Sequence, residues 1–208
     1  MTGRLLAIDT ATTACSVALF DDNILIASEY EEIGRGHAEK LIPMIAALPG
    51  KGRSDRIIVN CGPGSFTGVR IGVSAAKALG LAWGVRVDGY QCLSLVAAQA
   101  RQILDQQVPI CVAMAAGHGE FFVQNFDGPG LAIDALASLS PAASRDHAKS
   151  NIIAGSAARA LAEGLANGEF HEILPNAAKS YLLLQEMKQL KSKPIYGRQP
   201  DAKPTVAV

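Results

Sequence analysis

The chain has 208 residues, of which 49% are hydrophobic and 18% are charged, and its formal net charge is zero. This composition supports a large buried core and excludes an intrinsically disordered chain, and the zero net charge argues against a stand-alone nucleic-acid-binding module. No apolar run reaches the roughly 18 residues of a membrane-spanning helix, and no charged-then-apolar leader opens the chain. We therefore expect a cytoplasmic protein without membrane contacts.

The first 30 residues predict a three-stranded antiparallel meander. Short apolar runs separated by turn-forming residues span residues 4–8, 14–20 and 24–30. Asp9, Thr10 and Thr12 follow the first run, where side-chain oxygens can hold a phosphate or a hydrated magnesium ion in nucleotide-binding folds. The alternative is that Asp9 only stabilises the turn.

Residues 37–48 carry apolar side chains at helical spacing and predict an amphipathic helix in spite of Pro43. His37 opens this helix, and the position four residues later, where a second metal ligand would lie on the same face, is Leu41. We expect no metal site here, and we expect His37 to lie at the surface or at an interface.

The most informative stretch runs from residue 57 to residue 84. A buried strand at 57–59 is followed by the turn Gly62-Pro63-Gly64-Ser65 and by a helix that Ser65 or Thr67 caps and that ends near Trp83. The turn has two interpretations. In the first, the turn binds an anion at the helix N-terminus, with Gly62, Gly64 and Ser65 in contact with phosphate. In the second, it is a tight strand-to-helix connection, and its glycines are there only because the turn needs their backbone conformations.

Small residues recur every four positions along this helix. Each interior glycine costs roughly 1 kcal/mol of helix propensity relative to alanine, so the stripe requires close packing against another element in return. The stripe consists of Gly68, Gly72, Ala76, Gly80 and Gly84.

The rest of the chain continues an α/β pattern, with a crossover near residues 105–107 that divides it into a first lobe (1–104) and a second lobe with a C-terminal helix and tail (105–208). The second lobe repeats the first in reduced form. Further strands are expected at 85–90, 110–115, 121–126 and 152–154, and further helices at 94–104, 155–166 and 177–191. The four cysteines show no C-x-x-C spacing and are expected to be buried and reduced.

Four segments resemble the bacterial TsaB family of tRNA threonylcarbamoyladenosine biosynthesis proteins. The most specific is G-P-G-S-F-T-G-V-R-I-G at residues 62–72, and D-T-A-T-T-A-C-S-V-A-L at residues 9–19 matches the family's opening. His37 with Leu41, Ile42 and Pro43 matches its first helix, and P-I-Y-G-R at 194–198 matches a C-terminal Pro-x-Tyr-x-Arg element. The resemblance covers the first hundred residues most strongly.

The resemblance implies an α/β fold of the actin-like ATPase (ribonuclease H-like) type, with two related lobes of which the second is reduced. It also implies a non-catalytic scaffold of the complex that forms N6-threonylcarbamoyladenosine next to the anticodon of ANN-decoding tRNAs. Such a scaffold pairs with a TsaD-like catalytic subunit, recruits a TsaE-like ATPase, forms a homodimer when isolated and meets tRNA only through the complex. TsaD-type proteins carry His-x-x-x-His for a metal, whereas this chain has Leu41 at the second position.

The family dimerises through helices of its first lobe, and the small-residue stripe suits close helix packing, so the resemblance predicts a subunit interface there. The interface residues expected are His37, Leu41, Gly68, Arg70, Gly72, Ala76 and Gly80. If tRNA is contacted inside the complex, we expect a basic C-terminal region to help. That region comprises Lys188, Lys191, Lys193 and Arg198.

The chain departs from the family at Ala115-Ala116-Gly117, where an Asp-Ala-Arg sequence is usual, so a role for that loop cannot be carried over. No cofactor is expected to be required by this chain alone, and ATP or ADP at the interface with a partner stays open. The alternative function is an independent ATPase or kinase that uses Asp9, the 62–65 turn and Gly155-Ser156. A metalloprotease is disfavoured because no H-E-x-x-H occurs.

Overall fold

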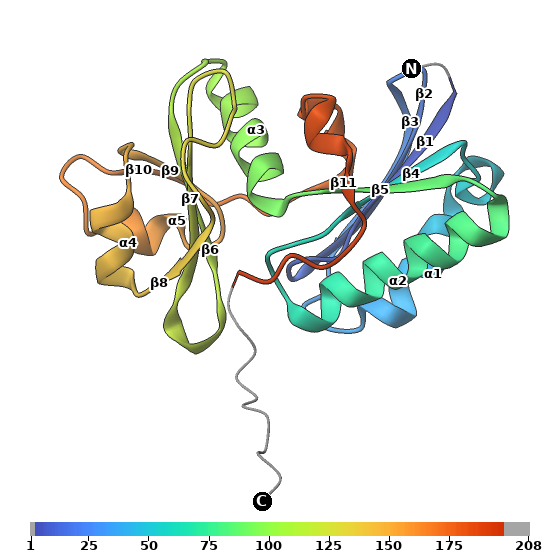
Figure 1. Ribbon diagram of the computed structural model, residues 1–208, viewed down its shortest axis with the longest axis horizontal. Helices are drawn as coiled ribbons and strands as arrows, with labels where there is room; N and C mark the ends of the chain where they lie inside the picture. Colours follow the sequence, from blue (N-terminus) through green and yellow to red (C-terminus); the bar gives the residue numbers. More distant parts are fainter. Residues whose placement is uncertain (1–2, 198–208) are drawn as a thin grey trace, which may run out of the picture.

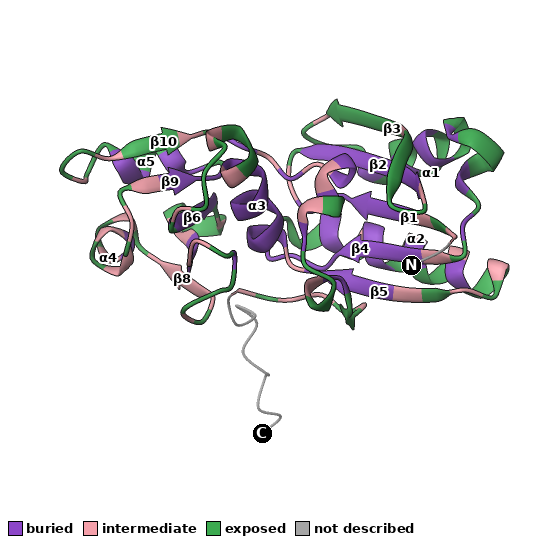
Figure 2. Cartoon of the chain, turned by 90° about the horizontal axis from the view of Figure 1, so that it is seen from above, coloured by how far each residue is buried: buried purple, intermediate pink, exposed green. Residues whose placement is uncertain are grey.

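The computed structural model describes residues 3–197 and contains two β-sheets with helices packed around each (Figure 1). The helix α3 (Cys92–Leu104) lies between the two sheets and is buried over most of its length (Figure 2). Arg198, expected to help in contacting tRNA, lies outside the described residues.

The first sheet has the strand order β11-β5-β4-β1-β2-β3. The meander predicted for the first 30 residues is confirmed, since the first three strands pair antiparallel, while β4 and β5 run parallel to β1. The strands are β1 (Arg4–Asp9), β2 (Ala14–Asp21), β3 (Ile24–Glu32), β4 (Arg56–Asn60), β5 (Arg86–Tyr90) and β11 (Leu190–Lys191).

Two helices, α1 (His37–Ala47) and α2 (Phe66–Trp83), cover one face of this sheet (Figure 1). Their apolar sides bury the larger core cluster together with the side chains of β1, β2 and β4 that point the same way. The opposite face is covered by the short 3-10 helix η3 (Ala177–Leu182), which packs on Phe20 and Tyr90. The amphipathic pattern at residues 37–48 therefore identified α1 correctly.

The second sheet has the order β10-β9-β6-β7-β8, and its helices are short. In chain order its five strands follow the same plan as β1 to β5, because β6, β7 and β8 are antiparallel neighbours and β9 and β10 run parallel to β6. This confirms two related halves with a reduced second one, in an actin-like α/β arrangement; the boundary at residue 104 stays a prediction. The elements are β6 (Ile110–Ala115), β7 (Phe121–Phe126), β8 (Ala137–Leu139), α4 (Pro141–His147), β9 (Ile152–Ala154), α5 (Ala158–Ala162) and β10 (Glu169–His171).

The prediction of a helix at residues 177–191 is wrong. The chain forms η3, a second 3-10 turn η4 (Glu186–Lys188) and the strand β11, which pairs with β5 of the first sheet. Leu183 adopts an extended conformation and is buried against the first sheet, so packing overrides the helical spacing of the leucines. Lys188 is only 7% exposed, and its carbonyl accepts a hydrogen bond from Arg56. It is therefore not available to contact tRNA.

The small-residue stripe of α2 faces the chain's own sheet and not a second subunit. A methyl group on Gly68 or Gly72 would collide with Thr10, and one on Gly80 would collide with Val87. Ala76 has no exposed surface. The expectation that Gly68, Gly72, Ala76 and Gly80 form a subunit interface is therefore wrong, since β1 and the strands beside it already occupy the space that these residues leave.

This packing makes Gly72→Ala destabilising. The added methyl group would meet Thr10 Oγ1, which cannot move aside easily because it donates a hydrogen bond to the Gly68 carbonyl. We expect the free energy of unfolding to fall by about 1–2 kcal/mol, since the overpacking outweighs the gain in helix propensity. Chemical denaturation measures the change. Ser74→Ala on the exposed side of the same helix is the control and should change stability by no more than about 0.5 kcal/mol. A Gly72→Ala protein as stable as the wild type would contradict this account.

Candidate functional site

A cleft of about 880 Å³ lies between the two halves of the chain. Its walls come from the loop after β1, the turn before α2, the end of β6 with the loop that follows, and the C-terminal segment. The lining residues include Ala11, Thr12, Thr13, Gly64, Ser65, Phe66, Arg70, Met114, Ala115, Ala116, Gly117, His118, Phe122, Ser156, Ile195, Tyr196 and Gly197.

The two loops expected to hold phosphate are fastened to each other. The Ser65 amide donates to the Ala11 carbonyl at 2.7 Å, and a methyl group on Gly64 would collide with that carbonyl. The Ser65 hydroxyl accepts a hydrogen bond from the Gly68 amide at 3.1 Å, which confirms Ser65 as the N-cap of α2. The glycine-rich turn therefore serves first as a tight connection against the loop after β1.

Asp9 is fully buried below these loops. Its Oδ1 accepts a hydrogen bond from the Ala11 amide at 3.1 Å, and its Oδ2 accepts from Asn60 Nδ2 at 2.7 Å and from the Tyr90 hydroxyl at 2.9 Å. Burial raises the pKa of Asp9 to about 6, although these hydrogen bonds lower it. Asp9 does not line the cleft, so its carboxylate stabilises the turn from within.

The sequence analysis did not identify Asn60 and Tyr90 as partners of Asp9, although the sequence contains a signal that groups the three residues. Asp9, Asn60 and Tyr90 are the last residues of β1, β4 and β5, which are parallel strands. The carboxyl ends of parallel strands meet at one edge of a sheet. Polar residues that end successive buried strands could therefore have been grouped before the structure was known.

The remaining residues expected to contact phosphate divide into two groups. Thr12, Gly64 and Ser65 line the cleft, whereas Thr10 and Gly62 are buried outside its lining. Thr10 is bonded to the Gly68 carbonyl, and the Gly62 amide donates to Asn60 Oδ1 at 2.8 Å. The structure thus brings only part of the expected set to the cleft.

The residues expected at a subunit interface are mostly internal. His37 is 6% exposed, and its Nε2 lies 3.3 Å from the Ala14 carbonyl oxygen. Leu41 is 1% exposed and belongs to the core. The expectation of a surface or interface position for His37 and Leu41 is wrong, because the amphipathic spacing turns both toward β2. Among the expected interface residues, only Arg70 is exposed.

Arg70 forms a cluster with two aromatic rings at the mouth of the cleft. Its Nε and Nη2 donate hydrogen bonds to the Tyr196 hydroxyl at 3.1 and 2.9 Å. Its guanidinium carbon lies 3.6 Å from the centre of the Phe66 ring, in cation–π contact. Tyr196 entered the sequence analysis only through the C-terminal motif, and Phe66 was not singled out for function.

The second-lobe loop contributes backbone and small side chains to the cleft. Ala115 donates its amide to the Ser156 hydroxyl at 2.9 Å, and residues 117–119 form a short 3-10 turn with His118 at a φ of 63°. Because Ala115-Ala116-Gly117 replaces Asp-Ala-Arg, this loop supplies neither the acid nor the guanidinium of that sequence.

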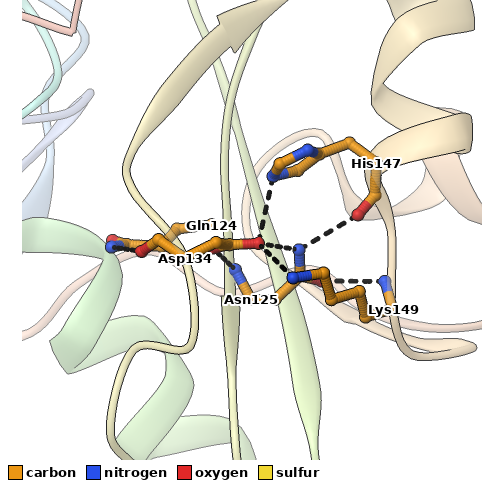
Figure 3. Close-up of polar contacts among 5 residues, drawn as sticks. All are labelled: Gln124, Asn125, Asp134, His147 and Lys149. Carbon is orange, nitrogen blue, oxygen red and sulfur yellow. Dashed lines mark hydrogen bonds and ion pairs between the residues drawn. The ribbon is translucent and has the colours of Figure 1, made fainter.

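A second polar cluster joins β7, the segment before β8 and the end of α4 (Figure 3). Asp134 Oδ2 accepts a hydrogen bond from Asn125 Nδ2 at 2.6 Å and lies 3.1 Å from His147 Nε2 and 3.5 Å from Lys149 Nζ. Burial alone would raise the pKa of Asp134, but the hydrogen bonds from Asn125 and the neighbouring His147 and Lys149 hold it below its ordinary value. The Asn125 side chain also donates to the His147 carbonyl, so the cluster fastens the end of α4 to β7 and has a structural role.

Within residues 3–197, no three His, Cys, Asp or Glu side chains are grouped closely enough to hold a metal ion. The cysteines there are buried and unpaired, as expected, and burial raises the pKa of the Cys61 thiol to about 11. A search of the same residues finds no helix long and apolar enough to span a membrane.

The raised pKa of Asp9 predicts a pH-dependent contribution to stability. Because the folded-state pKa of about 6 exceeds the ordinary value of 3.8, folding favours the protonated carboxyl, and this stabilisation is lost as the pH rises from 3.8 through about 6. We expect the free energy of unfolding of the wild type, relative to Asp9→Asn, to fall by about 2 kcal/mol between pH 4 and pH 7. Denaturation of both proteins across this range measures it. A constant difference would mean that Asp9 ionises in the fold as readily as in the unfolded chain.

In comparisons with known proteins, the chain is similar to proteins whose names refer to the modification of tRNA. Residues 29–140 match the family model described as TsaD, tRNA N6-adenosine threonylcarbamoyltransferase. The tRNA threonylcarbamoyladenosine biosynthesis protein TsaB of Escherichia coli is 39% identical over 99 residues, which cover 45% of this chain and 42% of that protein. An uncharacterized protein of Mycobacterium leprae is 32% identical over 214 residues, covering 98% of this chain and 57% of its own length.

Among solved structures, YeaZ from Pseudomonas aeruginosa aligns with a TM-score of 0.77 and 27% identity over 94% of this chain and 100% of that chain. The fold is therefore shared with a known structure over nearly the whole length. The chain spans about half the length of the two relatives compared by sequence.

Proposed function

This chain belongs to the TsaB (YeaZ) branch of the TsaD family, and we propose that it is a non-catalytic scaffold in forming threonylcarbamoyladenosine in tRNA. One observation is the main support for proposing that the chain has no catalytic activity of its own. Asp9, the acid beside the phosphate-type loops, is buried and bonded to Asn60, Tyr90 and its own turn. Among the described lining residues of the cleft there is no carboxylate, so no general base or magnesium ligand of that kind faces a substrate there.

The scaffold pairs with a TsaD-like catalytic subunit through the outer faces of α1 and α2. The inner faces of both helices are used in the chain's own core, but apolar side chains remain on the outside, with Leu81 87% exposed and Ile42 49% exposed. Exposed alanines, Ala46 and Ala78, lie on the same two helices and allow close approach. Exposed apolar groups on adjacent helices are typical of protein–protein contact surfaces. The same surface would serve the homodimer of the isolated protein.

The proposal includes recruitment of a TsaE-like ATPase and contact with tRNA only through the complex. Zero net charge and the burial of Lys188 argue against tRNA binding by this chain alone. Lys191 and Lys193 stay exposed near the C-terminal end of the described residues, where they can support a contact that the partner initiates.

A negative charge introduced on the outer face of α2 should weaken the complex between this chain and the TsaD-like subunit. We expect Leu81→Asp to weaken pairing with the TsaD-like subunit at least tenfold, because the exposed leucine would be replaced by a carboxylate that loses its hydration in the contact. Analytical ultracentrifugation or calorimetry measures the affinity. Ile103→Asp, at a 61% exposed position on α3, is the matched control and should pair as the wild type does. If Leu81→Asp binds the TsaD-like subunit as tightly as the wild type and Ile103→Asp do, the outer face of α2 is excluded as the contact surface.

The whole proposal is tested by size-exclusion chromatography with light scattering, alone and with TsaD-like and TsaE-like proteins, while ATP turnover and tRNA modification are followed. We expect a protein inert by itself that forms the complex and restores threonylcarbamoyladenosine formation. The alternative, an independent ATPase or kinase, is favoured by the size of the cleft and by Thr12 and Ser65 in its wall. ATP hydrolysis by the isolated chain, lost in a folded Asp9→Ala variant, together with no complex, would establish that alternative.

A further inference from the structure

Two exposed aromatic rings stand at the mouth of the cleft. Phe66 is 55% exposed and Tyr196 is 49% exposed, and their ring centres are 5.6 Å apart at an interplanar angle of 35°. One ring begins α2, and the other is brought from the far end of the chain, where the Ile195 amide donates to the Cys61 carbonyl at 2.7 Å. In a chain with 5% aromatic residues, the pair offers a stacking surface on a cavity.

Arg70 contacts both rings, and one nitrogen of its guanidinium group remains able to donate hydrogen bonds. Tyr196 accepts hydrogen bonds from Nε and Nη2, and Phe66 lies against the guanidinium plane. The remaining nitrogen, Nη1, makes no hydrogen bond to any residue in the described part of the chain. An arginine fixed in this way loses little side-chain entropy when it binds a phosphate or a carboxylate.

The charge of the cleft favours an anion. No aspartate or glutamate is among its described lining residues, whereas Arg70 is. Hydroxyl groups of Thr12, Ser65 and Ser156 also line it, and the N-terminal end of α2 adds a partial positive charge.

An anion would not lie where the phosphate loops of the sequence analysis predicted it. The amides of Gly62, Ser65 and Gly68 are already bonded to Asn60, Ala11 and the Ser65 hydroxyl. Arg70 at the rim is therefore the charged donor that an anion at the mouth of the cleft would meet. A cavity of about 880 Å³ has the size of a small-molecule site.

We propose that the mouth of this cleft binds a nucleoside monophosphate unit, with the base stacked on the Phe66–Tyr196 pair and the phosphate bonded to Arg70. The inference rests on the proposed function, which brings the chain beside a nucleotide substrate. The same unit is supplied by a free nucleotide or by one residue of an RNA strand. The site differs from a magnesium–nucleotide site because the buried Asp9 has no part in it.

The test is isothermal titration calorimetry of the full chain with four probes at low salt, in magnesium-free buffer. The probes are AMP, adenosine, inorganic phosphate and the RNA trinucleotide ApApA. AMP should bind at least tenfold more tightly than adenosine or phosphate, because stacking and the charged hydrogen bond act together. Tighter binding of ApApA than of AMP assigns the unit to RNA, and the reverse order assigns it to a free nucleotide; both support the site.

Variants identify the residues involved. Arg70→Ala should weaken AMP binding at least tenfold while changing adenosine binding less than twofold, and Tyr196→Phe should weaken AMP binding about threefold because Arg70 loses its anchor. Arg53→Ala, which removes an exposed cation elsewhere, and Tyr181→Phe, which removes another partly exposed hydroxyl, are the matched controls and should bind AMP as the wild type does.

Absence of AMP and ApApA binding at millimolar concentration, or equal AMP affinity of Arg70→Ala and wild type, would overturn the inference. Binding of AMP no tighter than that of phosphate would also overturn it, since the rings would then contribute nothing. Pairing with the TsaD-like subunit is measured on the same samples. Intact pairing without AMP binding removes this inference alone, and AMP binding without pairing removes the proposed scaffold role.

Discussion

The structure depends on the close approach of α2 to β1. Gly64, Gly68 and Gly72 leave no side chain between the helix and the strand end, so the backbone of Thr10 and Ala11 lies directly against the helix. Hydrogen bonds from Thr10 and from the Ser65 amide fix this contact. Larger residues at those glycines would push α2 away from the sheet. The turn before α2, the wall of the cleft and the position of Arg70 all follow from this contact.

The same contact removes the acidic group that a phosphate-handling site would use. As the loop after β1 folds under the turn, Asp9 points inward and finds its partners at the ends of β4 and β5. A carboxylate held in this way is costly to ionise, as the pKa of about 6 indicates. The glycine-rich turn and the loop after β1 therefore stay in contact while Asp9 is part of the core, which is the observation behind the proposed scaffold role.

Local signals in the sequence predicted much of this and failed where packing decides. The apolar runs and the Ser65 cap placed β1 to β5 and α2, because these depend on spacing and capping within one segment. The glycine stripe was recognised as a close-packing surface, but a sequence does not say which element approaches it, and the strand beside it is in the same chain. The leucines after residue 182 keep helical spacing, yet Leu183 is extended and buried on the first sheet.

The C-terminal segment shows why the candidate site could not be assembled from the sequence. It runs back to pair with β5, covers Cys61 and places Tyr196 on Arg70, which lies 126 positions earlier in the chain. Nearby, a methyl group on Gly197 would meet both Phe122 of the second sheet and Pro63 of the turn, so the segment contacts both halves at the cleft. The end of the chain thereby holds the cleft wall and the exposed guanidinium in one geometry. Arg70 is thus held by a segment that contacts both halves of the fold.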